Sequence, residues 1–347
     1  MQDDQSRPQR TAPSPGRTVP QTDISGVPSP VPASEMYGSR PAPAAPAPAR
    51  GTAGRVDHLA SDDPITSRPR SSVQSQSVSG VVVSLGSGLL VLGLGVLAQM
   101  SAVDAGEEMP LLRATGLVFW IAAVVVILLA AAGALFAELA ARVGSASVGQ
   151  TRERTETYTA WLIAATATFA AVLLIATYHN VWALVIGPLL TSVSIFVALV
   201  SRDLLDDLTD SASRVASLLH GTVIHLIAFV ALSMIYLNKL PEWLSAGLVL
   251  VVSGMLILET LQRADISAGR RLGYASLGAL VMGQFAVAVN WWLTWNWTGG
   301  IALLVCFYIV AGILLAYSQQ DDIRPRDVAF YGGLGTVALA AIAVFSL

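Results

Sequence analysis

The stretch from Tyr158 to Val200 contains no lysine, arginine, aspartate or glutamate. As one α-helix it would be about 65 Å long, at about 1.5 Å per residue. That length is about twice the thickness of the hydrocarbon core of a bilayer. We therefore predict that this stretch forms two membrane-spanning helices, joined by a tight turn at TYHNVW, residues 177–182.

Apolar segments of similar length recur along the chain, which is 54% apolar and only 12% charged. A helix needs about 20 mostly apolar residues to cross a bilayer. The predicted fold class is all-α, a polytopic transmembrane helix bundle with nine spans. The spans are expected at 78–99, 114–137, 159–177, 181–200, 216–237, 243–261, 272–293, 299–317 and 328–346.

The N-terminal segment differs from the rest of the chain, because thirteen of the seventeen prolines lie before Ser71 and branched apolar side chains are scarce there. Such a segment cannot bury enough apolar surface to offset the entropy of ordering. We predict a disordered, proline-, alanine- and serine-rich cytoplasmic tail at 1–77 and a nine-span transmembrane helical domain at 78–347. No removable signal peptide is expected, since polar residues follow Met1. The tail is either simply solvated or binds a protein partner that recognises proline-rich segments.

The basic residues outside and beside the spans are divided unevenly between alternate loops. From Arg68 onward, twelve fall on the side of the tail, and only Arg113 and Lys239 fall on the other side. Short cytoplasmic loops carry an excess of lysine and arginine. We therefore expect a cytoplasmic N-terminus and an extracytoplasmic C-terminus.

Four tryptophans are concentrated in NWWLTWNWTGG, residues 290–300, at a predicted outer turn. Indole rings favour the headgroup zone of a bilayer, so one interpretation is membrane anchoring. The alternative is an aromatic wall that binds a lipid headgroup, a sugar or a quaternary ammonium ligand. The candidate binding residues are Trp291, Trp292, Trp295 and Trp297.

Uncharged polar residues lie near the middle of three predicted spans: Thr168, His225 and Gln284. The three hairpins that contain them are spaced as a parallel repeat of about 58 residues would be. If the repeat is real, these side chains face a common interior, bind a ligand there, and His225 exchanges a hydrogen bond with Gln284. The alternative is that each of them only holds two helices together.

Charged residues are absent from the middle of every predicted span, and Glu138 and Glu259 lie within a few residues of the cytoplasmic ends. This distribution argues against an ion-coupled pump. A metal pair of His220 with His225 is not expected, because five residues turn a helix by about 140° and place the two rings on different faces. Cys306 is the only cysteine, so neither a disulfide within the chain nor a cysteine-based metal site is expected.

Small residues at intervals of four predict close helix contacts. They occur at Gly80, Ser84 and Gly88, and again at Gly332, Thr336 and Ala340. We expect both sets to lie in helix interfaces.

The acidic segment RDLLDDLTD, residues 202–210, places its aspartates on one face of a helix. We expect a short helix at the cytoplasmic membrane surface. The alternative is a magnesium site for a diphosphate, formed by Asp203, Asp206 and Asp210. Their spacing resembles the first metal motif of membrane prenyltransferases of the ubiquinone-synthesis type, which implies magnesium-dependent prenyl transfer. Arg202 stands at the asparagine position of that motif, and the second motif is missing.

The last three predicted spans resemble the C-terminal part of an uncharacterised bacterial family of multi-pass membrane proteins. The resemblance is carried by MGQFAVAVNWWLTWNWTGGIALLVCFYIVAGILLAY and VAFYGGLGTVALAAIAVF. It implies the bacterial cytoplasmic (inner) membrane as location and no activity. We expect a non-enzymatic binding, transport-like or assembly component that contacts the lipid bilayer, with no nucleic-acid partner and no cofactor apart from magnesium in the alternative above.

Overall fold

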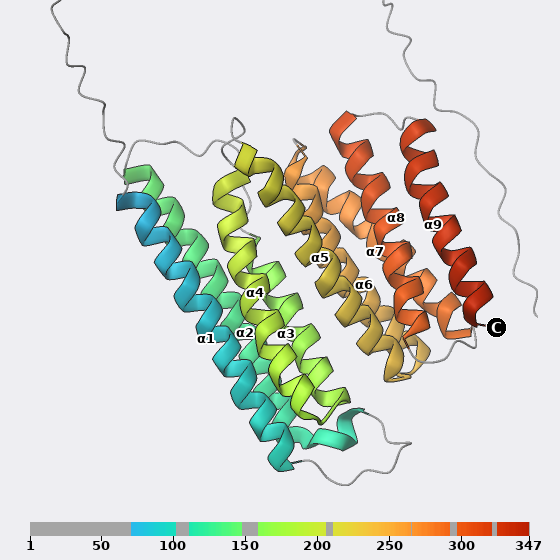
Figure 1. Ribbon diagram of the computed structural model, residues 1–347, viewed down its shortest axis with the longest axis horizontal. Helices are drawn as coiled ribbons and strands as arrows, with labels where there is room; N and C mark the ends of the chain where they lie inside the picture. Colours follow the sequence, from blue (N-terminus) through green and yellow to red (C-terminus); the bar gives the residue numbers. More distant parts are fainter. Residues whose placement is uncertain are drawn as a thin grey trace, which may run out of the picture. The chain divides into compact units, whose positions relative to one another are not determined.

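Figure 1 shows a computed structural model of the chain, which divides into two units, Met1–Asp63 and Pro64–Leu347. The structure describes residues 71–101, 111–147, 159–205, 211–264, 266–291, 297–320 and 325–346, all in the second unit. The predicted disorder of residues 1–70 lies outside the described residues. The first helix begins at Ser71, within the segment that we assigned to the tail.

The described residues form nine α-helices and one short 3₁₀ turn, and they form no strand. Each helix coincides with one of the nine predicted spans and is long and apolar enough to cross a membrane. The predicted fold class is therefore confirmed, and the chain is a multi-pass helical membrane protein. The helices are α1 (Ser71–Ser101), α2 (Leu111–Ser147), α3 (Ala160–Thr177), α4 (Val181–Leu205), α5 (Ser211–Leu237), α6 (Glu242–Thr260), α7 (Ala268–Trp291), α8 (Thr298–Gln320) and α9 (Pro325–Ser346), with η1 at Leu261–Arg263.

Successive helices run in alternating directions (Figure 1). We call the end at which α3, α5, α7 and α9 begin the basic end, because the arginine-bearing segments predicted to be cytoplasmic link the helices there. The other end, at which α4, α6 and α8 begin, is called the far end. Which end faces the cytoplasm stays a prediction.

The turn between α3 and α4 confirms the division predicted for the long uncharged stretch. Helix α3 ends at Thr177 and α4 begins at Val181. The side-chain oxygen of Asn180 accepts a hydrogen bond of 2.8 Å from the backbone N–H of Ala183. Asparagine is well suited to this place, because its short side chain satisfies an N–H group that has no partner within the helix.

Helix α3 is the central element of the unit. Nearly all its side chains from Ala160 to Ala176 are buried, and it packs against α1, α2, α4, α5 and α6. Helix α5 joins this group to the later helices, since it packs against α4, α6 and α8 as well. Alanines make up much of α3, and their small side chains let five neighbours approach it closely.

The small-residue interface predicted for α1 is confirmed. A Cβ atom at Gly88 would collide with the Ser192 hydroxyl and lie 3.2 Å from the carbonyl oxygen of Pro188, both on α4. Ser84 is buried, and Gly80 lies beside Leu199 of α4. The absence of a side chain at Gly88 therefore lets α1 and α4 come together.

The corresponding prediction for α9 is wrong. Gly332 has open space around its Cα atom, and Thr336 and Ala340 are exposed. Helix α9 packs against α8 through a different face, on which Gly335 meets Ile309. The spacing of small residues did not distinguish between the two faces, because α9 carries glycine and alanine on both.

Candidate functional site

The three polar residues predicted to share an interior are not brought together. Thr168 is fully buried in α3, and its hydroxyl donates a hydrogen bond of 2.7 Å to the carbonyl oxygen of Ala164 in its own helix. His225 is half-buried in α5, whereas Gln284 is exposed on α7. Gln284 therefore does not share an interior with Thr168 and His225, as the repeat hypothesis required, and whether these three residues bind a ligand stays a prediction. The physical reason is that α7 turns its smallest side chains toward α6 and α8, and Gln284 lies on the other face.

His225 faces α8 instead. Its ring contacts Phe307 and Tyr308, with centroids 5.7 Å and 5.9 Å away. Its Nδ1 atom lies 2.7 Å from the carbonyl oxygen of Gly221. A carbonyl can only accept, so Nδ1 carries a proton and donates it.

The tryptophan cluster divides into residues with different surroundings. Trp292 and Trp295 lie outside the described residues. Trp291 is exposed, and its Nε1–H donates to Oε1 of Glu242 over 3.0 Å. Trp297 is half-buried between two rings, Tyr178 at 6.1 Å and Phe229 at 5.7 Å. Whether these residues bind a ligand stays a prediction.

The magnesium alternative also stays a prediction. Helix α4 continues through Asp203 to Leu205, but nothing is described of the Asp203 side chain, and Asp206 and Asp210 lie outside the described residues.

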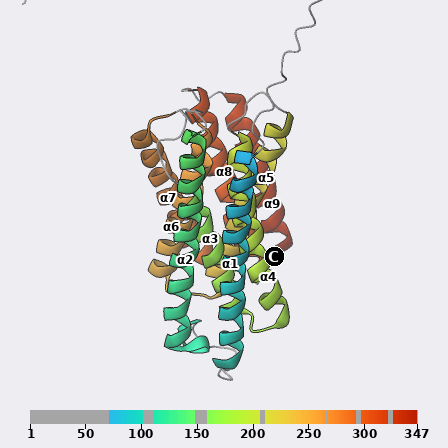
Figure 2. The same ribbon diagram turned by 90° about the vertical axis from the view of Figure 1, so that its left-hand side faces the viewer.

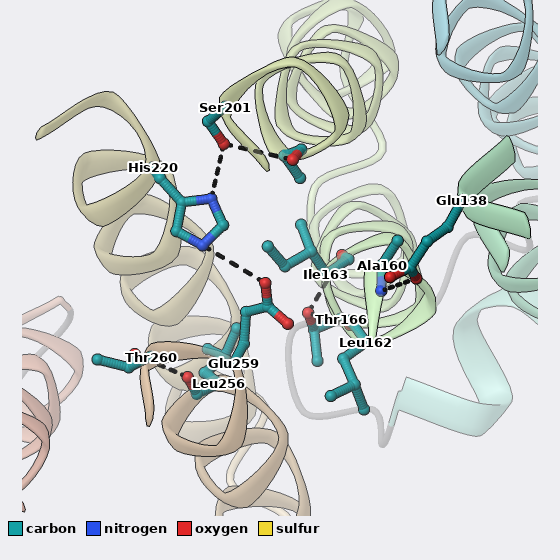
Figure 3. Close-up of polar contacts among 11 residues, drawn as sticks. Glu138, Ala160, Leu162, Ile163, Thr166, Ser201, His220, Leu256, Glu259 and Thr260 are labelled. Atoms are coloured by element: carbon teal, nitrogen blue, oxygen red, sulfur yellow. Dashed lines mark hydrogen bonds and ion pairs between the residues drawn. The ribbon is translucent and has the colours of Figure 1, made fainter. Parts of the chain in front are cut away.

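A buried polar cluster lies at the basic end, where α4, α5 and α6 meet (Figure 3). We call Ser201, His220 and Glu259 the His220 cluster. The Ser201 hydroxyl oxygen lies 2.9 Å from Nδ1 of His220, and Nε2 of the same ring lies 3.4 Å from Oε1 of Glu259. All three residues are at most 3% exposed.

Each member of the His220 cluster comes from an apolar helix close to its basic end. Ser201 follows the apolar part of α4, His220 is the tenth residue of α5, and Glu259 is the second-last residue of α6. Helix α5 packs against both α4 and α6, so its imidazole can reach both neighbours at once. The two ring nitrogens thereby hold three helices together.

The hydrogen bonds of the His220 cluster allow two proton arrangements. If Ser201 donates to Nδ1, the ring is neutral and Nε2–H donates to an ionised Glu259. If Ser201 instead donates to the Ala198 carbonyl, 3.3 Å away, Nδ1–H donates to Ser201 and one proton is shared between Nε2 and Glu259. The second arrangement holds one proton more than the first. The His220 cluster can therefore bind a proton without losing its hydrogen bonds.

Further polar groups at the basic end are bonded to backbone atoms. Oε2 of Glu138 accepts a hydrogen bond of 3.0 Å from the N–H of Ala160, at the start of α3. Arg271 of α7 is buried and donates to the carbonyl oxygens of Ala264 and Ile266 over 3.4 Å and 3.1 Å. The Glu138 contact lies at the start of α3, and the Arg271 contacts lie in the connection between η1 and α7.

A serine, a histidine and a carboxylate also make up the catalytic set of serine hydrolases, in which serine contacts Nε2 and the carboxylate contacts Nδ1. The two contacts are exchanged in the His220 cluster, and the Ser201 side chain is covered by α5. A substrate carbonyl has no approach to its oxygen. The geometry therefore supports proton binding and does not supply a nucleophile.

A family model described as protein of unknown function (DUF5656) matches residues 109–345. The chain belongs to this DUF5656 family. The match extends well beyond the three spans on which we based the resemblance to an uncharacterised family, and it includes the whole His220 cluster. No curated protein and no solved structure matches the chain.

Sequence reasoning missed the His220 cluster in this DUF5656 member. We noted Glu259 as a carboxylate near the end of a span and compared His220 only with His225. A usable signal was present, because both are titratable residues inside apolar helices on the same side of the membrane. The sequence did not indicate that α4, α5 and α6 are neighbours, and only that adjacency makes the pair.

Proposed function

We propose that the chain is a non-enzymatic binding or transport-like component of the bacterial inner membrane, in which the His220 cluster binds and releases a proton. In this proposal the tail is cytoplasmic and the C-terminus extracytoplasmic, in agreement with the distribution of basic residues. The proposal rests on one observation, the 3.4 Å contact between the buried side chains of His220 and Glu259 on neighbouring helices.

The energetics of burial support a role for this proton. A charge in an apolar interior is costly unless it is paired and hydrogen-bonded. When His220 is neutral and Glu259 is ionised, the three side chains together carry one negative charge, and one more proton removes it. Gain or loss of that proton therefore changes the free energy with which α5 packs against α6, which is how a protonation event biases a conformational equilibrium.

Other titratable groups lie on the helices around the His220 cluster at the same end of the unit. Glu138 is on α2 beside the start of α3, Arg271 is on α7, and Tyr274 and Tyr317 contact each other between α7 and α8. Any of these groups could also cause a change of structure with pH. The test therefore compares variants that alter one glutamate of α6 and leave all these groups in place.

The test is a distance measurement in lipid nanodiscs as a function of pH. Spin labels are attached to cysteines that replace the exposed residues Leu218 on α5 and Leu272 on α7, after Cys306→Ala removes the native thiol. We expect the distance distribution of this parent to change as the pH is lowered. Glu259→Gln cannot ionise and keeps a similar shape, so it should give the low-pH distribution at every pH.

The matched control is Glu242→Gln, which removes the exposed carboxylate at the far end of the same helix. This variant should retain the pH response of the parent. A parent distribution that is independent of pH would contradict the proposal, and so would a pH response that persists in Glu259→Gln.

A further inference from the structure

Gln284 occupies an unusual environment for an amide side chain. It lies on α7 seven residues before Trp291, about 10 Å along the helix axis from that end of the apolar span Ala268–Trp291 and therefore inside it. Its side chain is exposed on the surface of the helical unit. Figure 2 shows α7 at the edge of that unit, so this surface faces the hydrocarbon of the bilayer when the chain spans it.

The two faces of α7 have different roles. The buried face carries small residues and Met282, and it packs against α6 and α8, where Gly278 lies between Ile257 and Leu314. The other face carries Gln284. The described contacts of α7 therefore account for one face; on the second face, Trp291 at the end of the helix bonds to Glu242 of α6, and Gln284 lies exposed.

The second face has the residue spacing of a helix-pairing seam. We call these residues the α7 seam, and all of them are exposed except the half-buried Val287. The intervals between them alternate between three and four residues, as along any one face of an α-helix, so these side chains form a continuous stripe that a partner helix can contact. The α7 seam comprises Leu277, Leu280, Gln284, Val287 and Trp291.

Lipid cannot satisfy the amide of Gln284. Hydrocarbon offers neither donors nor acceptors, and a polar group without a hydrogen bond in such a medium costs several kcal/mol by transfer estimates, roughly 2–7. Its side chain forms no hydrogen bond with the described residues. A partner within the membrane that both donates and accepts would remove this cost.

We propose that the α7 seam binds a second copy of this chain, so that two α7 helices pair in parallel about a two-fold axis along the membrane normal. A carboxamide is self-complementary: across the axis, the NH₂ group of each Gln284 donates to the carbonyl oxygen of the other. A single polar residue at an a position is a known device for fixing the register and number of paired helices. Closed two-fold symmetry is also the commonest arrangement of identical subunits.

The pairing is tested by dilution of donor- and acceptor-labelled full-length protein in lipid vesicles, with energy transfer reporting association. We expect the wild-type chain to form dimers and Gln284→Leu to weaken association about three- to tenfold, as interhelical polar contacts in membranes generally do. Gln284→Asn keeps an amide and should restore part of the loss. The matched control is Thr336→Val, because Thr336 is an exposed polar residue within a span whose hydroxyl is already bonded to Gly332 in its own helix.

The site of contact is tested by oxidative crosslinking in a Cys306→Ala background. Leu280→Cys on the α7 seam should give disulfide-linked dimers. Val124→Cys is the control, since Val124 is exposed to the same extent, 54% against 55%, but lies on α2. Equal crosslinking at both positions would overturn the proposal, as would association that Gln284→Leu leaves unchanged. Crosslinking of Leu280→Cys to a different membrane protein instead of a second copy would also overturn it.

Discussion

The indole ring of Trp297 stacks on the phenol ring of Tyr178, with their centroids 6.1 Å apart and their planes inclined by only 6°. The same indole contacts Phe229, so one side chain just before α8 contacts both Tyr178, which follows α3, and a ring of α5. Close by, the side-chain amide of Asn238 donates a hydrogen bond of 2.8 Å to the hydroxyl of Thr177. The far end is therefore held by specific packing between helices that are distant in sequence.

The stacking predicts that Trp297→Ala is strongly destabilising. Loss of a packed aromatic ring with two ring neighbours should lower the free energy of unfolding by about 1–3 kcal/mol. Trp182→Ala is the control, because Trp182 also lies at the far end but is 73% exposed, and a change at an exposed site usually alters stability by less than about 0.5 kcal/mol. Unfolding in mixed micelles by a denaturing detergent measures both. Equal losses would contradict the structural distinction between the two tryptophans.

The close approach of α1 and α4 predicts opposite effects at two glycines of one helix. Gly88→Ala places a methyl group against Ser192 and Pro188 and should destabilise the protein by about 1–3 kcal/mol. Gly86→Ala meets no atom within 4 Å, so it should be neutral or stabilise by up to about 1 kcal/mol through its better helix propensity. The same unfolding assay checks this pair, and a loss at Gly86 as large as that at Gly88 would be inconsistent with the packing.

The positions of the helices could be predicted because they depend on a property that is summed over many residues. The length and apolar content of each segment determine whether it can span a bilayer, and a single polar residue such as His225 or Gln284 does not change that sum. The rotation of a helix depends on much smaller differences. Helix α7 is apolar on both faces, and no amphipathic pattern indicated that Met282 would be buried and Gln284 exposed.

The candidate site depended on adjacency as well as on rotation. Hairpin topology allowed us to place Glu259 and His220 on the same side of the membrane, but many arrangements of nine helices satisfy that condition. Whether α5 lies beside α6 with both side chains turned inward is decided by packing around α3, and that packing involves helices far apart in the sequence. The same reason explains why Trp297 was grouped with its sequence neighbours instead of with Tyr178.

The distribution of basic residues predicts which end of the unit faces the cytoplasm, and this can be checked in intact cells. With Cys306→Ala as background, Trp243→Cys places an exposed thiol at the far end and Ser267→Cys places one at the basic end. A membrane-impermeant maleimide should label the far-end thiol without disruption of the cells. It should label the basic-end thiol only after the membrane is opened. The reverse pattern would mean that the orientation is inverted.

The last prediction concerns His179, in the turn between α3 and α4. Burial lowers the pKa of His179 below its ordinary value of 6.5, because the charged ring loses solvation, and the Nε2 atom is buried with no hydrogen-bond partner among the described residues. The unfolded chain keeps the ordinary pKa, so at pH values below it the unfolded state binds more protons than the folded state. The contribution of His179 to the free energy of unfolding is therefore constant above about pH 6.5 and falls as the pH is lowered further.

Replacing His179 by asparagine removes this contribution and should leave a shallower loss of stability between about pH 7 and about pH 5. Unfolding in mixed micelles at several pH values, for the wild type and for His179→Asn, measures the difference. Parallel pH profiles would show that the ring is equally solvated in both states, contrary to the structure.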